Sequence, residues 1–273
     1  MATHGSAFPI AKLALNNSVP PILMASLRMG LVMLLLIPFW KFKIPDKKYL
    51  KSLLLFSFSM GVLVYVFMNL SLKYSTFISP IIIGSQLAVP FAVVLSAIMI
   101  GENISKKKWV FVFLAFFGIT VVFFDPELKN NLIGLLFASL MALFFAIAQV
   151  YSRKLKELSL TLINAYTGLF GFFILIIVSF FIEGEVVANI KNINLESWML
   201  IGYQAIIVSL FAHMSMFYLY KFYTVGQIFP FYSLFPIFGI ILTFLIFREI
   251  PSLLFFIGSF FVISSVILLE KTK

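Results

Sequence analysis

The chain lacks cysteine and has few acidic residues. Without cysteine it can form no disulfide, no thiolate nucleophile and no thiolate metal ligand. Only ten residues are Asp or Glu, and all of them fall between the apolar runs of the sequence or at the ends of those runs. We therefore expect no carboxylate at the middle of a membrane, where it could carry a proton or hold a cation.

Signatures of enzymes are also missing. The sequence has no HExxH motif, no GxSxG motif and no Walker motif, and it contains only two histidines. These absences disfavour a hydrolase and an ATP-driven pump contained in one chain. We expect a protein that is not an enzyme and that uses no cofactor and no metal.

Apolar residues dominate what is present. The 273 residues are 62% hydrophobic and 11% charged, with a mean hydropathy of +1.11. A soluble core cannot hide so much apolar surface, so the composition predicts an all-α polytopic protein in a lipid bilayer. The net charge of +10 does not indicate a nucleic-acid partner, because the Lys and Arg residues lie in short segments between apolar runs.

The apolar runs predict about ten transmembrane helices. The first, residues 1–15, would be about 22 Å long against a hydrocarbon core of roughly 30 Å. This first helix is predicted to be truncated, with about ten further apolar residues upstream of Met1. The other predicted spans are 21–40, 49–72, 77–100, 109–124, 132–151, 160–182, 198–220, 225–247 and 253–269.

The basic residues are unevenly divided between the two sets of loops. Fourteen of the 20 Lys and Arg residues lie in loops after even-numbered spans or in the C-terminal tail, against four in loops after odd-numbered spans. Because cytoplasmic loops carry the excess of Lys and Arg, both termini are predicted to be cytoplasmic.

Part of the sequence occurs twice. Segment 65–108 resembles segment 213–252 when one is shifted over the other by 146 to 148 residues. The alternative to a repeat is chance similarity, because both segments are rich in Phe, Leu and Ile. The matches between less common residue types disfavour chance. The matched pairs are Met68 with Met216, Lys73 with Lys221, Thr76 with Thr224, Pro90 with Pro236 and Glu102 with Glu249. We predict two five-helix repeats, 1–124 and 132–269, inverted because each has an odd number of spans.

Several short motifs resemble those of one family. HGSAFPIAK at 4–12 resembles a WGSxFxxxK motif, with His4 in place of Trp, and PPILMASLR ends at Arg28. Segments 73–74, 90–102, 148–153 and 236–249 follow at similar spacings. In this order they resemble the EamA-like branch of the drug/metabolite transporter superfamily. The resemblance implies a ten-helix carrier built from two inverted five-helix repeats.

Polar side chains inside the membrane are costly and are therefore the default functional candidates. Lys12 and Arg28 are the strongest. Arg28 lies eight residues into its span, about 12 Å deep, so it either lines a cavity or extends its side chain to the interface. Lys12 favours the cavity, because no acidic residue neighbours it in sequence. Aligning PIAK with AIAQ makes Gln149 its repeat partner.

Gln86 lies between Pro80 and Pro90, where it could bind a ligand or satisfy backbone groups freed by the prolines. Other polar residues are weaker candidates, since each could instead form an interhelical hydrogen bond or an interfacial aromatic contact. These are Tyr65, Asn69, His213 and Tyr232, together with Tyr203, Gln204 and Gln227. The pairs Gly101-Glu102 and Arg248-Glu249 are expected to cap or turn helix ends.

The sequence thus favours a secondary transporter of a small polar metabolite, an amino acid or a related carboxylate-bearing compound, through a central cavity. Lys12 and Arg28 would clamp the carboxylate, because two inward cations have no inward anion to balance them. Coupling would run through exchange or a substrate gradient, with His213 as the one conventional proton carrier. The alternative is a non-transporting membrane scaffold or accessory subunit. We expect the protein in the cytoplasmic (inner) membrane of a bacterium; a homodimer is left open.

Overall fold

The structure, a computed structural model, describes residues 2–40, 44–212, 215 and 235–272. Every regular element in these ranges is a helix, which confirms the predicted all-α class. A helix pairs the backbone N–H and C=O groups within its own segment, and this is what a chain surrounded by lipid requires.

We call residues 1–124 the first half and residues 132–270 the second half. The helices of the first half are α1 (Ala2–Gly5), α2 (Ala7–Asn16), α3 (Pro21–Trp40), α4 (Lys47–Phe58), η1 (Ser59–Val64), α5 (Tyr65–Lys73), α6 (Ser79–Ser85), α7 (Ala88–Ile100) and α8 (Lys106–Phe123). A 3-10 helix, η2 (Pro126–Asn131), links the halves. The described helices of the second half are α9 (Leu132–Ser152), η3 (Arg153–Leu155), α10 (Leu160–Ile182), α11 (Val186–Asn192), α12 (Leu195–Tyr203), η4 (Gln204–Ala212), α15 (Phe235–Phe247) and α16 (Leu253–Lys271).

Among the described residues, six helical segments are long and apolar enough to cross a membrane, by length and composition. They are Pro21–Trp40, Lys47–Lys73, Ser79–Met99, Pro126–Leu155, Leu160–Ile182 and Leu195–Ala212. Two shorter apolar helices, Phe235–Phe247 and Leu253–Leu269, accompany them. The predicted spans 198–220 and 225–247 extend into residues outside the described ranges.

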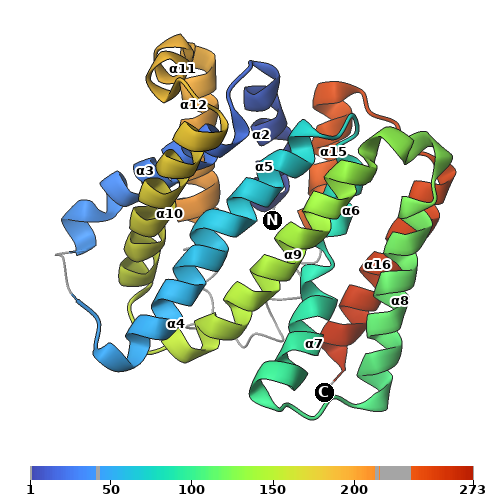
Figure 1. The fold of residues 1–273 in the computed structure, drawn as a ribbon. Coiled ribbons are helices and arrows are strands. Elements are labelled where there is room, and N and C mark those ends of the chain that lie inside the picture. Colours follow the sequence, from blue (N-terminus) through green and yellow to red (C-terminus); the bar gives the residue numbers. More distant parts are fainter. Residues whose placement is uncertain (1, 41–43, 213–214, 216–234, 273) are drawn as a thin grey trace.

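The helix connections gather at two opposite ends of the molecule (Figure 1). The connections around 17–20, 74–78, 124–131, 183–194 and 248–252 lie at the end drawn uppermost, which we call the upper end. Connections 101–105 and 153–159 lie at the opposite, lower end, together with the C-terminus. Loops after odd-numbered and even-numbered predicted spans therefore lie at different ends.

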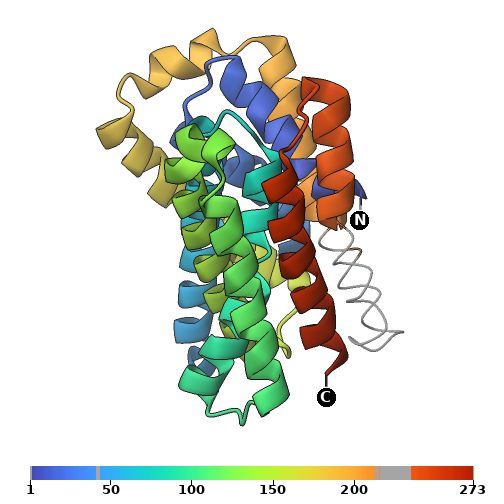
Figure 2. The same ribbon diagram turned by 90° about the vertical axis from the view of Figure 1, so that its right-hand side faces the viewer.

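Corresponding helices of the two halves pack against each other in pairs. Helix α3 packs along α10, and α8 packs along α16; both views show the latter pair side by side (Figures 1 and 2). Glycines allow the α8–α16 contact, because a Cβ on Gly118 would lie 2.7 Å from the carbonyl oxygen of Gly258, and a Cβ on Gly258 would lie 2.6 Å from that of Gly118. Small residues at such contacts let membrane helices approach closely.

Segments of π-helix occur at corresponding places in the two halves. The third span contains the π-helical segment η1, and the eighth contains the π-helical segment η4. The fourth span is interrupted at Gln86 and Leu87, between α6 and α7, close to the prolines that predicted a weakened helix. Segments of π-helix frequently mark functional sites.

Candidate functional site

Arg28 lies inside the protein, with 5% of its surface exposed. Its Nε donates a hydrogen bond to the hydroxyl of Ser209 at 2.9 Å, and its Nη1 donates one to Oε1 of Gln204 at 2.8 Å. Both acceptors belong to η4 of the second half, whereas Arg28 belongs to α3 of the first. The guanidinium therefore lies between the two halves and does not extend to an interface.

An aromatic ring completes the surroundings of this cation. The Tyr65 ring, at the start of α5, lies with its centroid 4.2 Å from Cζ of Arg28. A cation over the face of an aromatic ring is attracted by the ring's quadrupole. We call Arg28, Tyr65, Gln204 and Ser209 the Arg28 cluster.

The π-helical form of η4 is what brings its two acceptors to the same guanidinium. In a regular α-helix, residues five apart point about 140° away from each other. In a π-helix, which bonds residue i to residue i+5, positions five apart lie on one side. Gln204 and Ser209 are five apart, so sequence patterns based on 3.6 residues per turn place them on different faces. Such patterns therefore miss Ser209 and make Gln204 only a weaker candidate.

The Arg28 cluster also contacts α2. Nε2 of Gln204 donates to the carbonyl oxygen of Ala7 at 2.6 Å, so the Gln204 amide bridges α2 and Arg28. The hydroxyls of Ser6 and Tyr203 share a hydrogen bond of 2.8 Å next to it. These bonds hold the Gln204 carbonyl in place as an acceptor for Arg28.

The hydrogen-bonding partners of Arg28 are neutral. In the described part of the chain, neither ion pair involves Arg28, and Nη2 has no hydrogen-bond partner. A buried cation without a counter-charge is costly in a low-dielectric interior. The cluster is therefore chemically suited to receive an anion, which can accept hydrogen bonds from Nη2.

Lys12 lies apart from the Arg28 cluster. Its Nζ donates to the carbonyl oxygens of Leu72 and Ser75, each at 2.7 Å, at the C-terminal end of α5. A cation is favourable there, because the last carbonyls of a helix carry partial negative charge. The charge of Glu249 also acts on Lys12. Lys12 and Glu249 are far apart in sequence, so this electrostatic effect depends on the fold and not on neighbouring residues.

The other predicted site residues lie at several places. The amide of Asn69 donates to the carbonyl oxygen of Pro21 at 2.9 Å, which joins α5 to the start of α3. Gln86 is buried at the break between α6 and α7. His213 and Tyr232 lie outside the described residues. Of the candidates named from the sequence, the structure thus brings together Arg28, Tyr65 and the weaker candidate Gln204.

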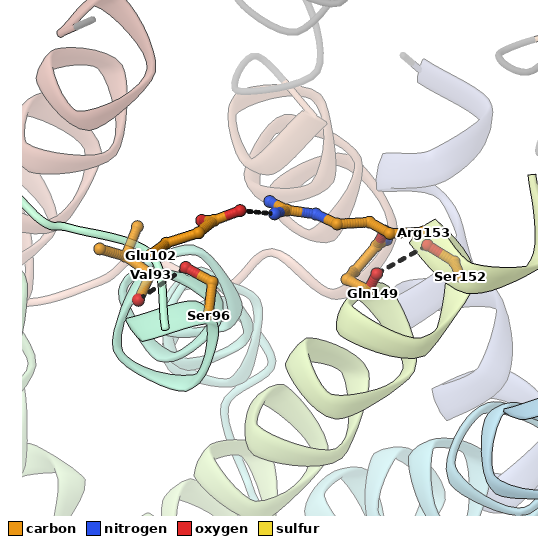
Figure 3. Close-up of polar contacts among 6 residues, drawn as sticks. All are labelled: Val93, Ser96, Glu102, Gln149, Ser152 and Arg153. Atoms are coloured by element: carbon orange, nitrogen blue, oxygen red, sulfur yellow. Dashed lines mark hydrogen bonds and ion pairs between the residues drawn. The ribbon is translucent and has the colours of Figure 1, made fainter. Parts of the chain in front are cut away.

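Gln149 is exposed near the lower end, where its backbone carbonyl accepts a hydrogen bond from the Ser152 hydroxyl (Figure 3). The neighbouring Arg153 forms an ion pair with Glu102, which follows α7. Lys12 is near the upper end, so it and Gln149 do not share a site. Equivalent positions of inverted repeats lie at opposite ends unless they are close to the midplane.

Glu102 has a lowered pKa. The Ser96 hydroxyl is the largest cause, and the positive charges of Arg153 and Lys108 act in the same direction. A carboxyl with a lowered pKa stays ionised as the pH falls until the lowered value is reached. The Glu102–Arg153 ion pair therefore persists at neutral pH and is lost only in acid.

These features define a class of protein: apolar helices in two similar halves, spanning a membrane several times, with a buried cationic cluster between the halves. A family model described as "EamA-like transporter family" matches residues 1–124 and 132–270. The chain belongs to the EamA-like transporter family, which confirms the resemblance noted in its motifs. The protein is therefore an integral multi-pass membrane protein of a transporter family.

Comparison with solved structures supports the fold. A chain titled "Crystal structure of protein" aligns with a TM-score of 0.56 over 98% of this chain and 97% of that chain, at 15% sequence identity. At this identity the similarity concerns the fold alone. A search of curated proteins found no match.

Proposed function

We propose that the protein is a secondary transporter of small carboxylate-bearing metabolites, such as amino acids or related compounds. The observation that carries this proposal is the buried Arg28, held between the two halves by partners that, among the described residues, are all neutral. A substrate carboxylate would supply the missing charge and accept hydrogen bonds from Nη2. A purely cationic substrate would add a second positive charge to the same place.

The proposed mechanism is alternating access in an inverted two-repeat arrangement of ten helices. Three features support it. The π-helical segments occupy corresponding spans, Gly118 and Gly258 contact each other reciprocally, and α3 packs along its counterpart α10. Arg28 reaches from the first half to acceptors in the second, so movement between the halves would change its surroundings.

Not all sequence-predicted candidates have the same support. Tyr65 contacts Arg28 directly and belongs to the proposed site. Lys12 remains a proposed second cation, although two backbone carbonyls already accept its hydrogen bonds. Gln86, Asn69, Gln149, His213 and Tyr232 remain proposals of lower support, and exchange or a substrate gradient remains the proposed driving force.

The direct test is transport by purified protein in liposomes. Vesicles would be loaded with unlabelled compound and offered the same compound with a radioactive label, using a panel of amino acids and carboxylic acids. Matched amines without a carboxylate serve as controls. We expect accumulation of at least one carboxylate-bearing compound and none of its decarboxylated amine. Equal uptake of acid and amine would refute the proposed substrate class, and uptake of neither would favour an accessory role.

The proposed orientation places the lower end and both termini in the cytoplasm. Single cysteines at Lys47 and Lys107 should be shielded from an impermeant thiol reagent in intact cells, because the native chain has no cysteine and both positions lie in the basic loops. A cysteine at Lys129, exposed in η2 at the upper end, is the matched control and should be labelled. The reverse pattern would invert the orientation.

A further inference from the structure

At the upper end, a carboxylate of the second half binds the start of a helix in the first half. Oε2 of Glu249 accepts a hydrogen bond from the backbone N–H of Ile78 at 2.7 Å, and Oε1 accepts one from Ser79 at 2.8 Å. Glu249 follows α15 and has 7% of its surface exposed. It thereby holds the N-terminus of α6, a helix on the other half.

A second carboxylate repeats this geometry. The two carboxylate oxygens of Glu183, which follows α10, accept hydrogen bonds from the backbone N–H groups of Ile22 and Leu23 at 2.7 and 2.8 Å. These groups begin α3. A third contact joins the Ser252 hydroxyl of the second half to the buried Asp125, which directly follows the first half. We call these three contacts the upper latches.

The lower end is held differently. Its carboxylate contacts between the halves in the described residues are Glu102 with Arg153, whose side chains are 42% and 57% exposed, and Glu157 with Lys48, 63% and 64% exposed. The Tyr49 hydroxyl also donates to Glu157. Exposed ion pairs contribute little to stability, because water and salt screen them. The upper carboxylates, buried Glu249 and half-buried Glu183, instead accept charge-assisted hydrogen bonds from backbone N–H groups, and these are stronger than exposed ion pairs.

We propose that the upper latches hold this conformation closed at the upper end, and that the molecule must release Glu249 and Glu183 to open there. This inference rests on the proposed alternating-access function. It adds that the upper latches determine which conformation the protein adopts without substrate. The Glu183 latch acts on α3, which carries Arg28, and the Glu249 latch acts on α6, which ends next to Gln86, a proposed site residue of lower support. Release of these helix starts would therefore be coupled to movement at the Arg28 cluster.

The test measures distances across both ends in the absence of substrate. Spin labels would be placed at Thr76 and Ile250 across the upper end and, in a second labelled variant, at Lys106 and Lys154 across the lower end; all four positions are exposed. Each pair would be compared in the native background and in Glu249→Gln. A glutamine can accept only one of the two N–H groups, and its own amide N–H₂ then faces the other. Glu102→Gln, which breaks an exposed pair, is the matched control.

We expect Glu249→Gln to raise the ratio of long to short distances at the upper pair on the order of tenfold, and to shorten the lower pair. Glu102→Gln should leave the upper pair unchanged. Unchanged upper distances in both Glu249→Gln and Glu249→Ala, or lengthening of both ends together, would overturn the proposal. Because no substrate is present, the distances test the latches separately from transport; absent transport with shifted distances would count against the proposed function alone.

Discussion

Replacing Arg28 with glutamine should lower transport of a carboxylate-bearing substrate on the order of 100-fold. The substitution removes the buried positive charge and the Nη2 donors while keeping a side chain that can hydrogen-bond within η4. Transport by the purified variant in liposomes measures the effect. Lys129→Gln, which removes an exposed cation at the upper end, is the control and should transport normally.

The melting temperature of the Arg28 variants distinguishes a substrate-binding role of Arg28 from a structural role. A buried unpaired charge costs free energy, so Arg28→Gln should unfold at the same temperature as the native protein or a higher one. Arg28→Lys keeps the charge but loses the planar guanidinium that reaches Ser209 and Gln204 together, so it should transport at an intermediate rate. Undiminished transport by Arg28→Gln, or lost transport accompanied by a marked drop in melting temperature, would contradict the assignment.

The composition and its long apolar runs were sufficient to predict the class of fold, because a continuous apolar run of about 20 residues indicates a helix that pairs its backbone groups within its own segment. Local signals also predicted helix ends: Gly101 ends α7 with a positive φ of 75°, the conformation that glycine adopts most readily. The interruption at Gln86 likewise follows from the neighbouring prolines. These features depend on residues close together in sequence.

The contacts of the candidate site depend on residues far apart in sequence, and this is where prediction failed. Gln204 and Ser209 lie 176 and 181 residues from Arg28, and a π-helical turn, which leaves no periodic signal, aligns them. Glu249 was expected to cap or turn a helix end, and it caps the start of α6, but that helix lies 170 residues away and its sequence position does not indicate it. Sequence can rank a polar residue by its depth in a span, but not by its partner on another helix.

Replacing Gly118 with alanine should destabilise the protein by about 1–3 kcal/mol, the usual cost of overpacking a tight contact. The new Cβ would lie 2.7 Å from the carbonyl oxygen of Gly258 and 2.9 Å from Cβ of Phe261, so α8 and α16 would have to separate. Thermal unfolding in detergent, followed by the loss of monodisperse protein, measures the effect.

Three further variants make this prediction specific to the α8–α16 contact. Gly202→Ala is the matched control: in the described part of the chain, no atom outside its own helix turn lies within 4 Å of the new Cβ, so the alanine should be neutral or stabilising by up to about 1 kcal/mol through its higher helix propensity. Gly258→Ala should destabilise about as much as Gly118→Ala, since its Cβ would lie 2.6 Å from the Gly118 carbonyl oxygen.

The double variant Gly118→Ala/Gly258→Ala should lose less stability than the sum of the two single losses, because helices already separated by one methyl group accommodate the second. Strictly additive effects, or equal melting temperatures for Gly118→Ala and Gly202→Ala, would show that α8 and α16 do not meet at these glycines.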